Sequence, residues 1–213
     1  SDLDGHGVPD GDDFSVPTLE WRLAYEKYKD KQGKGYGYHK YEAGEDPKTG
    51  QDDLALAFAL SGHVGGEEVD WDGVGTGRKY TTWSVTAEAC VPLGDNASFK
   101  CEAFTGRNFG FVYGQGPNPK THENVDAAGG WGQLEINPGL GLQFHLGAGM
   151  DHPKRSNLSV GDRSNNAAYY TNVFYKLSDA LIAALEGIHY ETSYVGGKTA
   201  KNERGQVSLI LVF

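Results

Sequence analysis

Apolar and polar side chains alternate with a period of two along most of this chain of 213 residues. Between Trp83 and Val91, apolar or small residues occupy the odd positions, and Ser84, Thr86 and Glu88 occupy even ones. The ranges 19–26 and 140–147 show a similar alternation, large apolar residues alternate with Ala in 54–60, and large apolar residues occupy every second position in 207–213. Period two is the spacing of β-strands with one apolar face. The pattern predicts an all-β chain.

Nine strands are expected, with two competing interpretations: residues 29–52 could add hairpin residues or change the strand count, and one other segment could be a helix. Residues 179–187 have leucines at helical spacing, but strand patterns on both sides favour a strand. The expected strands lie near 18–28, 53–63, 81–92, 97–107, 127–137, 140–150, 166–177, 180–194 and 205–213.

Long and short connections alternate from the second expected strand onward. Long loops on one rim and short turns on the other are typical of an outer-membrane β-barrel. We therefore expect residues 18–213 to form antiparallel transmembrane strands with short periplasmic turns, and only residues 29–52 break the rule. The short connections are 92–96, 137–139 and 177–179, and the long ones are 62–80, 107–126, 151–165 and 195–204.

Nine is an odd number, whereas single-chain bacterial barrels have an even number of strands. In a bilayer every backbone polar group must be paired, so both edge strands of the sheet need partners. We do not expect these strands to close a barrel alone. An upstream fragment or other chains would complete it. Residues 1–4 lack the basic region and apolar core of a signal peptide, so we expect the leader of an exported protein to have been removed.

The end of the chain resembles the C-terminal signature of outer-membrane β-barrel proteins, which the assembly machinery reads. The signature is a terminal aromatic residue preceded by apolar residues at every second position. The matching residues are Val207, Leu209, Leu211 and Phe213.

A wider resemblance to porin-like outer-membrane proteins covers residues 52–213. It includes the segments 83–85, 102–106, 129–134, 147–153 and 163–165, with a late Glu186. The resemblance implies a passive channel for small hydrophilic solutes or ions rather than an enzyme, although such porins usually have more strands.

Polar side chains opposite the apolar stripes are predicted to line a pore. Charges facing lipid at mid-bilayer cost about 2–4 kcal/mol for Lys or Arg, so these residues should face the lumen. There they would set ion selectivity, or alternatively only satisfy one another in interior salt bridges. Their acidic excess favours cations. The predicted pore-lining residues are Glu20, Arg22, Glu88, Lys100, Glu102, Gln133, Glu135, Gln143, His145 and Glu186. The aromatic residues expected in girdles at the membrane interfaces are Trp83, Tyr169, Tyr175 and Tyr190.

The N-terminal residues 1–17 form a separate acidic segment rich in Asp and Gly. Closely spaced carboxylates on a tight loop suit Ca²⁺, and the segment resembles thrombospondin type 3 calcium loops. A solvated acidic loop is the alternative. The candidate ligands are Asp2, Asp4, Asp10 and Asp12.

Composition narrows the remaining choices. The net charge is −10, and no basic patch is present, so no nucleic-acid partner is expected. Cys90 and Cys101 flank a turn almost symmetrically, but strand parity directs their thiols to opposite faces and argues against a disulfide. Two other functions stay open: a secreted calcium-dependent β-sandwich that binds glycans, and an outer-membrane enzyme that acts on lipid.

Deleting Phe213 should reduce assembly in the outer membrane while leaving translation intact, because the terminal aromatic is part of the signature. Membrane fractionation, compared with whole-cell protein levels, measures this. Normal membrane levels of the deletion variant would contradict the role of the signature.

Overall fold

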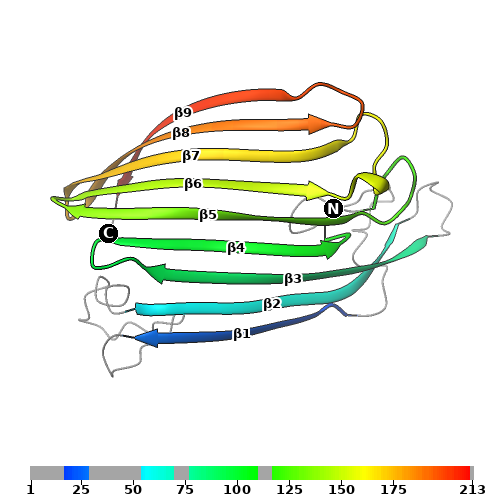
Figure 1. The fold of residues 1–213 in the computed structure, drawn as a ribbon, viewed down its shortest axis with the longest axis horizontal. Coiled ribbons are helices and arrows are strands. Elements are labelled where there is room, and N and C mark those ends of the chain that lie inside the picture. The colour runs from blue at the N-terminus through cyan, green and yellow to red at the C-terminus, as the bar shows by residue number, and fades with distance from the viewer. Residues whose placement is uncertain (1–16, 29–53, 70–76, 110–116, 212–213) are drawn as a thin grey trace.

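A computed structural model describes residues 17–28, 54–69, 77–109 and 117–211, in which nine strands form one sheet (Figure 1). The strands follow chain order from β1 to β9, and every neighbouring pair is antiparallel. They are β1 (Leu19–Tyr28), β2 (Leu54–Val69), β3 (Arg78–Pro92), β4 (Ala97–Arg107), β5 (Asp126–Gly139), β6 (Leu142–Pro153), β7 (Arg163–Ser178), β8 (Leu181–Tyr194) and β9 (Ala200–Leu211).

All nine expected strands are confirmed, and so is the alternation of their connections. The turns at 93–96, 140–141 and 179–180 lie on one rim, and the described loop residues at 108–109, 117–125, 154–162 and 195–199 lie on the other (Figure 1). Outside the strands, the described residues contain one 3₁₀ turn, Arg155–Asn157. No helix in the described part of the chain is long and apolar enough to span a membrane.

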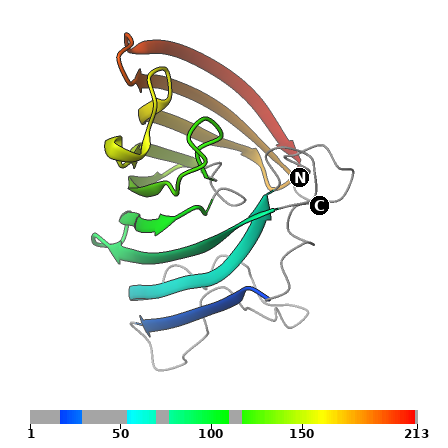
Figure 2. The same ribbon diagram turned by 90° about the vertical axis from the view of Figure 1, so that its right-hand side faces the viewer.

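The sheet is strongly curved (Figure 2) but not closed. Among the described strands, β1 pairs only with β2, and β9 pairs only with β8. Ser208 and Ile210, whose partners test closure, pair with Ala184 and Ile182 of β8. The prediction that these nine strands do not close a barrel by themselves is therefore confirmed for the described residues.

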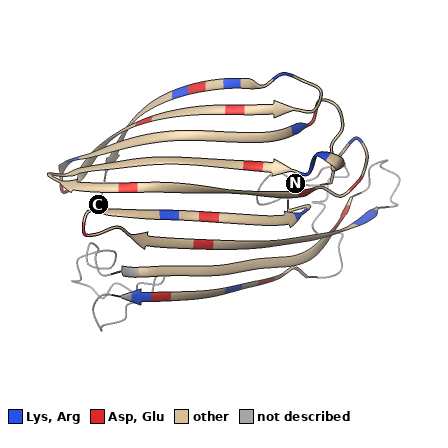
Figure 3. Ribbon diagram, in the orientation of Figure 1, with Lys and Arg blue, Asp and Glu red and all other residues tan. Residues whose placement is uncertain are grey.

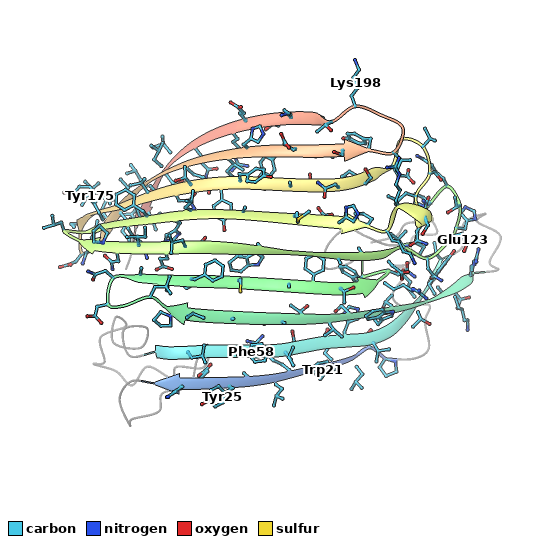
Figure 4. All side chains as sticks on the ribbon, in the orientation of Figure 1. Trp21, Tyr25, Phe58, Glu123, Tyr175 and Lys198 are labelled. Atoms are coloured by element: carbon cyan, nitrogen blue, oxygen red, sulfur yellow. The ribbon has the colours of Figure 1, made fainter. Side chains whose placement is uncertain are left out.

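One face of the sheet, the apolar face, carries an uncharged belt. It consists of every second residue in 19–25, 56–64, 83–91, 97–105, 128–136, 142–150, 167–175, 181–187 and 205–211. None of these residues is charged, and large members such as Leu23, Leu146 and Leu209 are more than 60% exposed. Figure 4 shows Trp21, Tyr25 and Phe58 on the strands that begin this belt.

The belt is slanted across the sheet. Its edge toward the long loops is marked by Arg107 on β4 and by Glu203 on β9. The residues that pair with Glu203 across successive strands lead to Cys101 on β4. The edge of the belt is therefore displaced along the strands by six residues (107 − 101) over the five strand-to-strand steps from β4 to β9. About one residue, ~3.3 Å, per strand spacing of ~4.8 Å corresponds to a strand tilt of roughly 35°. Transmembrane barrels have strand tilts of about 35–45°.

The opposite face, the polar face, is more crowded. On β2 and β3, Ala57, Ala59 and Cys90 of this face are buried, while Phe58 and Val85 of the apolar face are about 40% exposed. Side chains approach one another on the concave side of a curved sheet, so the polar face is the concave one. This arrangement is that of a barrel wall with a polar interior.

Two expected positions on the apolar face are wrong. Leu140 was expected in the strand of the belt, but it lies in the two-residue turn between β5 and β6 with a φ of 57°. Glycines at 139 and 141 also have positive φ, and this local turn ends the alternation. Tyr190 pairs with Ala168 on the polar face, so it is no girdle residue, whereas Trp83, Tyr169 and Tyr175 lie on the apolar face.

Placing a charge in the middle of the belt should destabilise the protein in lipid. Leu185 is 57% exposed and lies midway between Leu181 and His189 on the apolar face. Leu185→Arg should lower the free energy of unfolding in vesicles by about 2–4 kcal/mol. Its neighbour Ala184 faces the other side, so Ala184→Arg is the matched control and should cost much less. Equal effects in a denaturant titration would contradict a lipid-facing belt.

Candidate functional site

The structure brings the ten predicted pore-lining residues onto the polar face. Strand register alone places them there, because residues paired directly across strands share a face. The rows connect, for example, Glu88 with Glu102, and Glu135 with His145. The charged positions on β3, β4 and β5 are visible as a group in Figure 3.

Most of these residues also share one depth relative to the apolar belt, whereas Glu135 and Gln143 lie three residues from its middle. On β1 the belt runs from Leu19 to Tyr25. Arg22 lies at the middle of this range, with its side chain on the polar face. On β3 the belt runs from Trp83 to Val91, and Glu88 lies one residue from the middle. Similarly, Lys100, Glu102, Gln133, His145 and Glu186 each lie within two residues of the middle of the belt on their strands. The result is a charged band, slanted with the belt, halfway between the two rims.

Two ion pairs organise this band. Arg22 on β1 reaches Glu88 on β3 across the small Ala59 of β2, with Nη2 donating to Oε2 at 3.1 Å and Nη1 donating to Oε1. Lys100 Nζ lies 2.7 Å from Glu135 Oε2, and the Gln143 amide donates to the other oxygen of Glu135. Each pair joins two different strands and holds the long side chain of Arg22 or Lys100 against the polar face of the sheet.

Several members of the band were missed by the sequence analysis, although strand parity could have identified them. Trp131 is the partner of Glu102 on β5. Tyr170 donates a hydrogen bond to Gln133 Oε1 at 3.0 Å, and the Asn172 amide donates to Glu186 Oε2 at 3.2 Å. Arg204 also lies on the polar face, outside the charged band, so the basic complement of this face is larger than expected.

Aromatic rings on the polar face lie over glycines of neighbouring strands. A Cβ on Gly147 would be 2.3 Å from Tyr170 Cζ, and one on Gly129 would be 2.6 Å from Phe104 Cζ. Rings lying flat in this way project less into the space beside the wall. The glycines therefore keep that space open at the depth of the charged band.

Two long loops are joined by a polar cluster on their rim. Asn118, only 3% exposed, donates from Nδ2 to Asn157 O at 3.0 Å and to Asp162 Oδ2 at 2.9 Å. Asp162 also accepts from Ser159 N–H at 2.7 Å and pairs with Lys120. Burial alone would raise the pKa of Asp162, but these donors and the Lys120 charge outweigh it and hold the pKa below its usual value. The cluster thus stabilises a defined loop arrangement at neutral pH.

A lipid-acting enzyme would need a Ser or His on the apolar face near the long-loop rim, and His189 occupies such a position. It borders a groove of about 820 Å³ whose lining includes Leu134, Leu146 and Tyr169. Its ring nitrogens lie 3.3 Å and 3.4 Å from the carboxylates of Glu191 and Glu203. Both nitrogens therefore contact carboxylates rather than a hydroxyl that could act as nucleophile.

The remaining predicted residues have different outcomes. Val207 and Leu209 lie on the apolar face of β9 with Leu211, whereas Phe213 and the candidate calcium ligands Asp2, Asp4, Asp10 and Asp12 lie outside the described residues. The described ranges contain no cluster of three or more His, Cys, Asp or Glu able to hold a metal. Cys90 pairs with Lys100, and Cys101 pairs with Ala89, so the thiols lie on opposite faces, and both are free.

Comparison with known proteins supports the fold. No protein-family model matches the sequence, and no curated protein matches it. The chain is similar to the crystal structure of the outer membrane channel DcaP of Acinetobacter baumannii, with a TM-score of 0.72 and 13% sequence identity. The match covers 94% of this chain and 52% of that chain, so the present chain spans about half the length of its structural neighbour.

The loop cluster should depend on the charge of Asp162. A folded-state pKa below the unfolded value stabilises the protein above the unfolded pKa, about 3.9, and this contribution is lost as the pH falls through the folded pKa. Asp162→Asn should therefore speed amide hydrogen exchange in 154–162 at pH 7, and the difference from the wild type should vanish in acid.

Asp179→Asn, on the short-turn rim, is the control. Its carboxylate is almost fully exposed and pairs with Lys176. This variant should leave exchange in 154–162 unchanged. An Asp162→Asn variant that differs from the wild type equally at all pH values would contradict the electrostatic role.

Proposed function

We propose that this chain forms part of the wall of a porin-like channel in the bacterial outer membrane, which passes small hydrophilic solutes or ions by passive diffusion. The apolar face contacts outer-membrane lipid, and the polar face borders the aqueous path. Strands outside the described sheet, from this protein or another chain, complete the barrel.

The observation that carries the proposal is that the uncharged belt on the apolar face and the charged band on the polar face lie at the same depth. The uncharged belt slants at a transmembrane tilt, and the charged band follows the same slant at the middle of the belt. A soluble sandwich would cover the apolar face with a second sheet, but the described strands form one sheet only. Charged side chains at mid-depth are tolerated when they line water, so a water-filled path explains their position.

The charges of the band favour cations over anions. Glu88, Glu102 and Glu186 outnumber Arg22 and Lys100 near mid-depth, and rings of acidic side chains are typical of cation-conducting pores. Similarity to an outer membrane channel supports passage of solutes in general, and its chain is about twice as long as this one.

Reversing one charge in the band should change ion selectivity. The complete channel, purified from the outer membrane with any chain that completes its barrel and reconstituted in planar bilayers, should conduct ions. In this channel Lys100→Glu should shift the reversal potential in a KCl gradient toward the cation value. Lys201 lies on the apolar face beside Glu191, so Lys201→Glu is the matched control and should not shift it. Absence of conductance would refute the channel. Equal shifts of the reversal potential in Lys100→Glu and Lys201→Glu would show that the effect does not depend on a place of Lys100 in the pathway.

A further inference from the structure

Within the charged band, the polar face is hollowed between β1 and β5. The hollow has a volume of about 100 Å³. Small residues of β1 and β2, Ala24, Ala57 and Ala59, leave this space beneath the longer side chains. Arg22, Glu88, Lys100, Glu102 and Trp131 surround it.

The cations of the hollow are already matched by carboxylates. Arg22 is engaged with both oxygens of Glu88, and Lys100 lies 2.7 Å from Glu135. An anionic solute would have to separate one of these pairs to gain a cationic partner. Anions are therefore poor ligands for this hollow.

Glu102 is different, because its charge has no basic partner in contact. It lies directly opposite Glu88, and like charges opposite each other in a sheet repel. Trp131 lies beside Glu102 on β5. The Arg22 charge attracts Glu102 only from a distance, because the guanidinium itself is engaged with Glu88. No salt bridge joins Glu102 to a Lys, Arg or His of the described residues. The carboxylates that line the hollow (Glu26, Glu88 and Glu102) thus outnumber its two cations (Arg22 and Lys100).

The chemistry around Glu102 suits an organic ammonium group better than a metal ion. The described residues hold no cluster of three metal-ligating side chains. An ammonium group instead needs a carboxylate to accept its N–H donors and gains from an aromatic face, and Trp131, 39% exposed, lies beside Glu102.

We infer that the hollow is a binding subsite for the ammonium group of a small organic solute, with Glu102 as its acceptor and Trp131 as its aromatic wall. The inference rests on the proposed channel function, since the hollow must face the aqueous path. The inference narrows the class of solutes that the proposed channel passes to amines and amino compounds. These would bind in the hollow, at the middle of the belt, during passage.

Calorimetric titration of the full chain in detergent tests the subsite, with n-butylammonium as the probe and n-butanol and butyrate as neutral and anionic counterparts. The ammonium should bind, the other two should not, and KCl at equal ionic strength should not abolish binding. Glu102→Gln should weaken binding by about tenfold or more, as expected for loss of a charge-assisted hydrogen bond. Removing the repulsion with Glu88 should leave this variant at least as well folded.

Glu203→Gln removes the same charge from the apolar face and is the matched control, so it should bind butylammonium as the wild type does. Equal losses in both variants, equal binding of butanol, or full competition by K⁺ would overturn the subsite. A protein that conducts without binding the ammonium refutes this inference alone. One that binds the ammonium without conducting refutes the channel but not the subsite.

Discussion

The structure depends on one constraint: in hydrocarbon, every backbone N–H and C=O must be paired within the protein. The nine-stranded antiparallel ladder meets this requirement from β2 to β8, where each strand has two neighbours. Side chains then have only two directions in which to point. One direction carries the uncharged belt, and the other carries the charged band.

Strand tilt links these two faces. A shift of about one residue per strand moves the belt toward the short-turn rim from β1 to β9, and the band moves with it. As a result, Arg22 on β1 and Glu186 on β8 lie at similar depth although no hydrogen-bonded row connects them. Charges on distant strands therefore lie at the same level of the sheet relative to the belt.

Small residues decide which long side chains can meet inside this wall. Ala59 of β2 allows Arg22 and Glu88 to pair across it, and Gly147 provides a surface for the ring of Tyr170. The pairing consumes the cations of the band but leaves Glu102 without one. The same packing that shapes the hollow thus leaves it with an unmatched negative charge.

The sequence by itself determined the strands, their faces and the alternation of the rims, because period two is a local property of the chain. That is why the predicted side was correct for Glu88, Lys100 and Glu135, and why parity separated Cys90 from Cys101. It failed at Leu140, where positive φ ended the alternation. Only the tertiary structure decided the pairing of Arg22 with Glu88, the Asn118–Asp162 cluster and the hollow beside Trp131, because these contacts depend on register between distant segments.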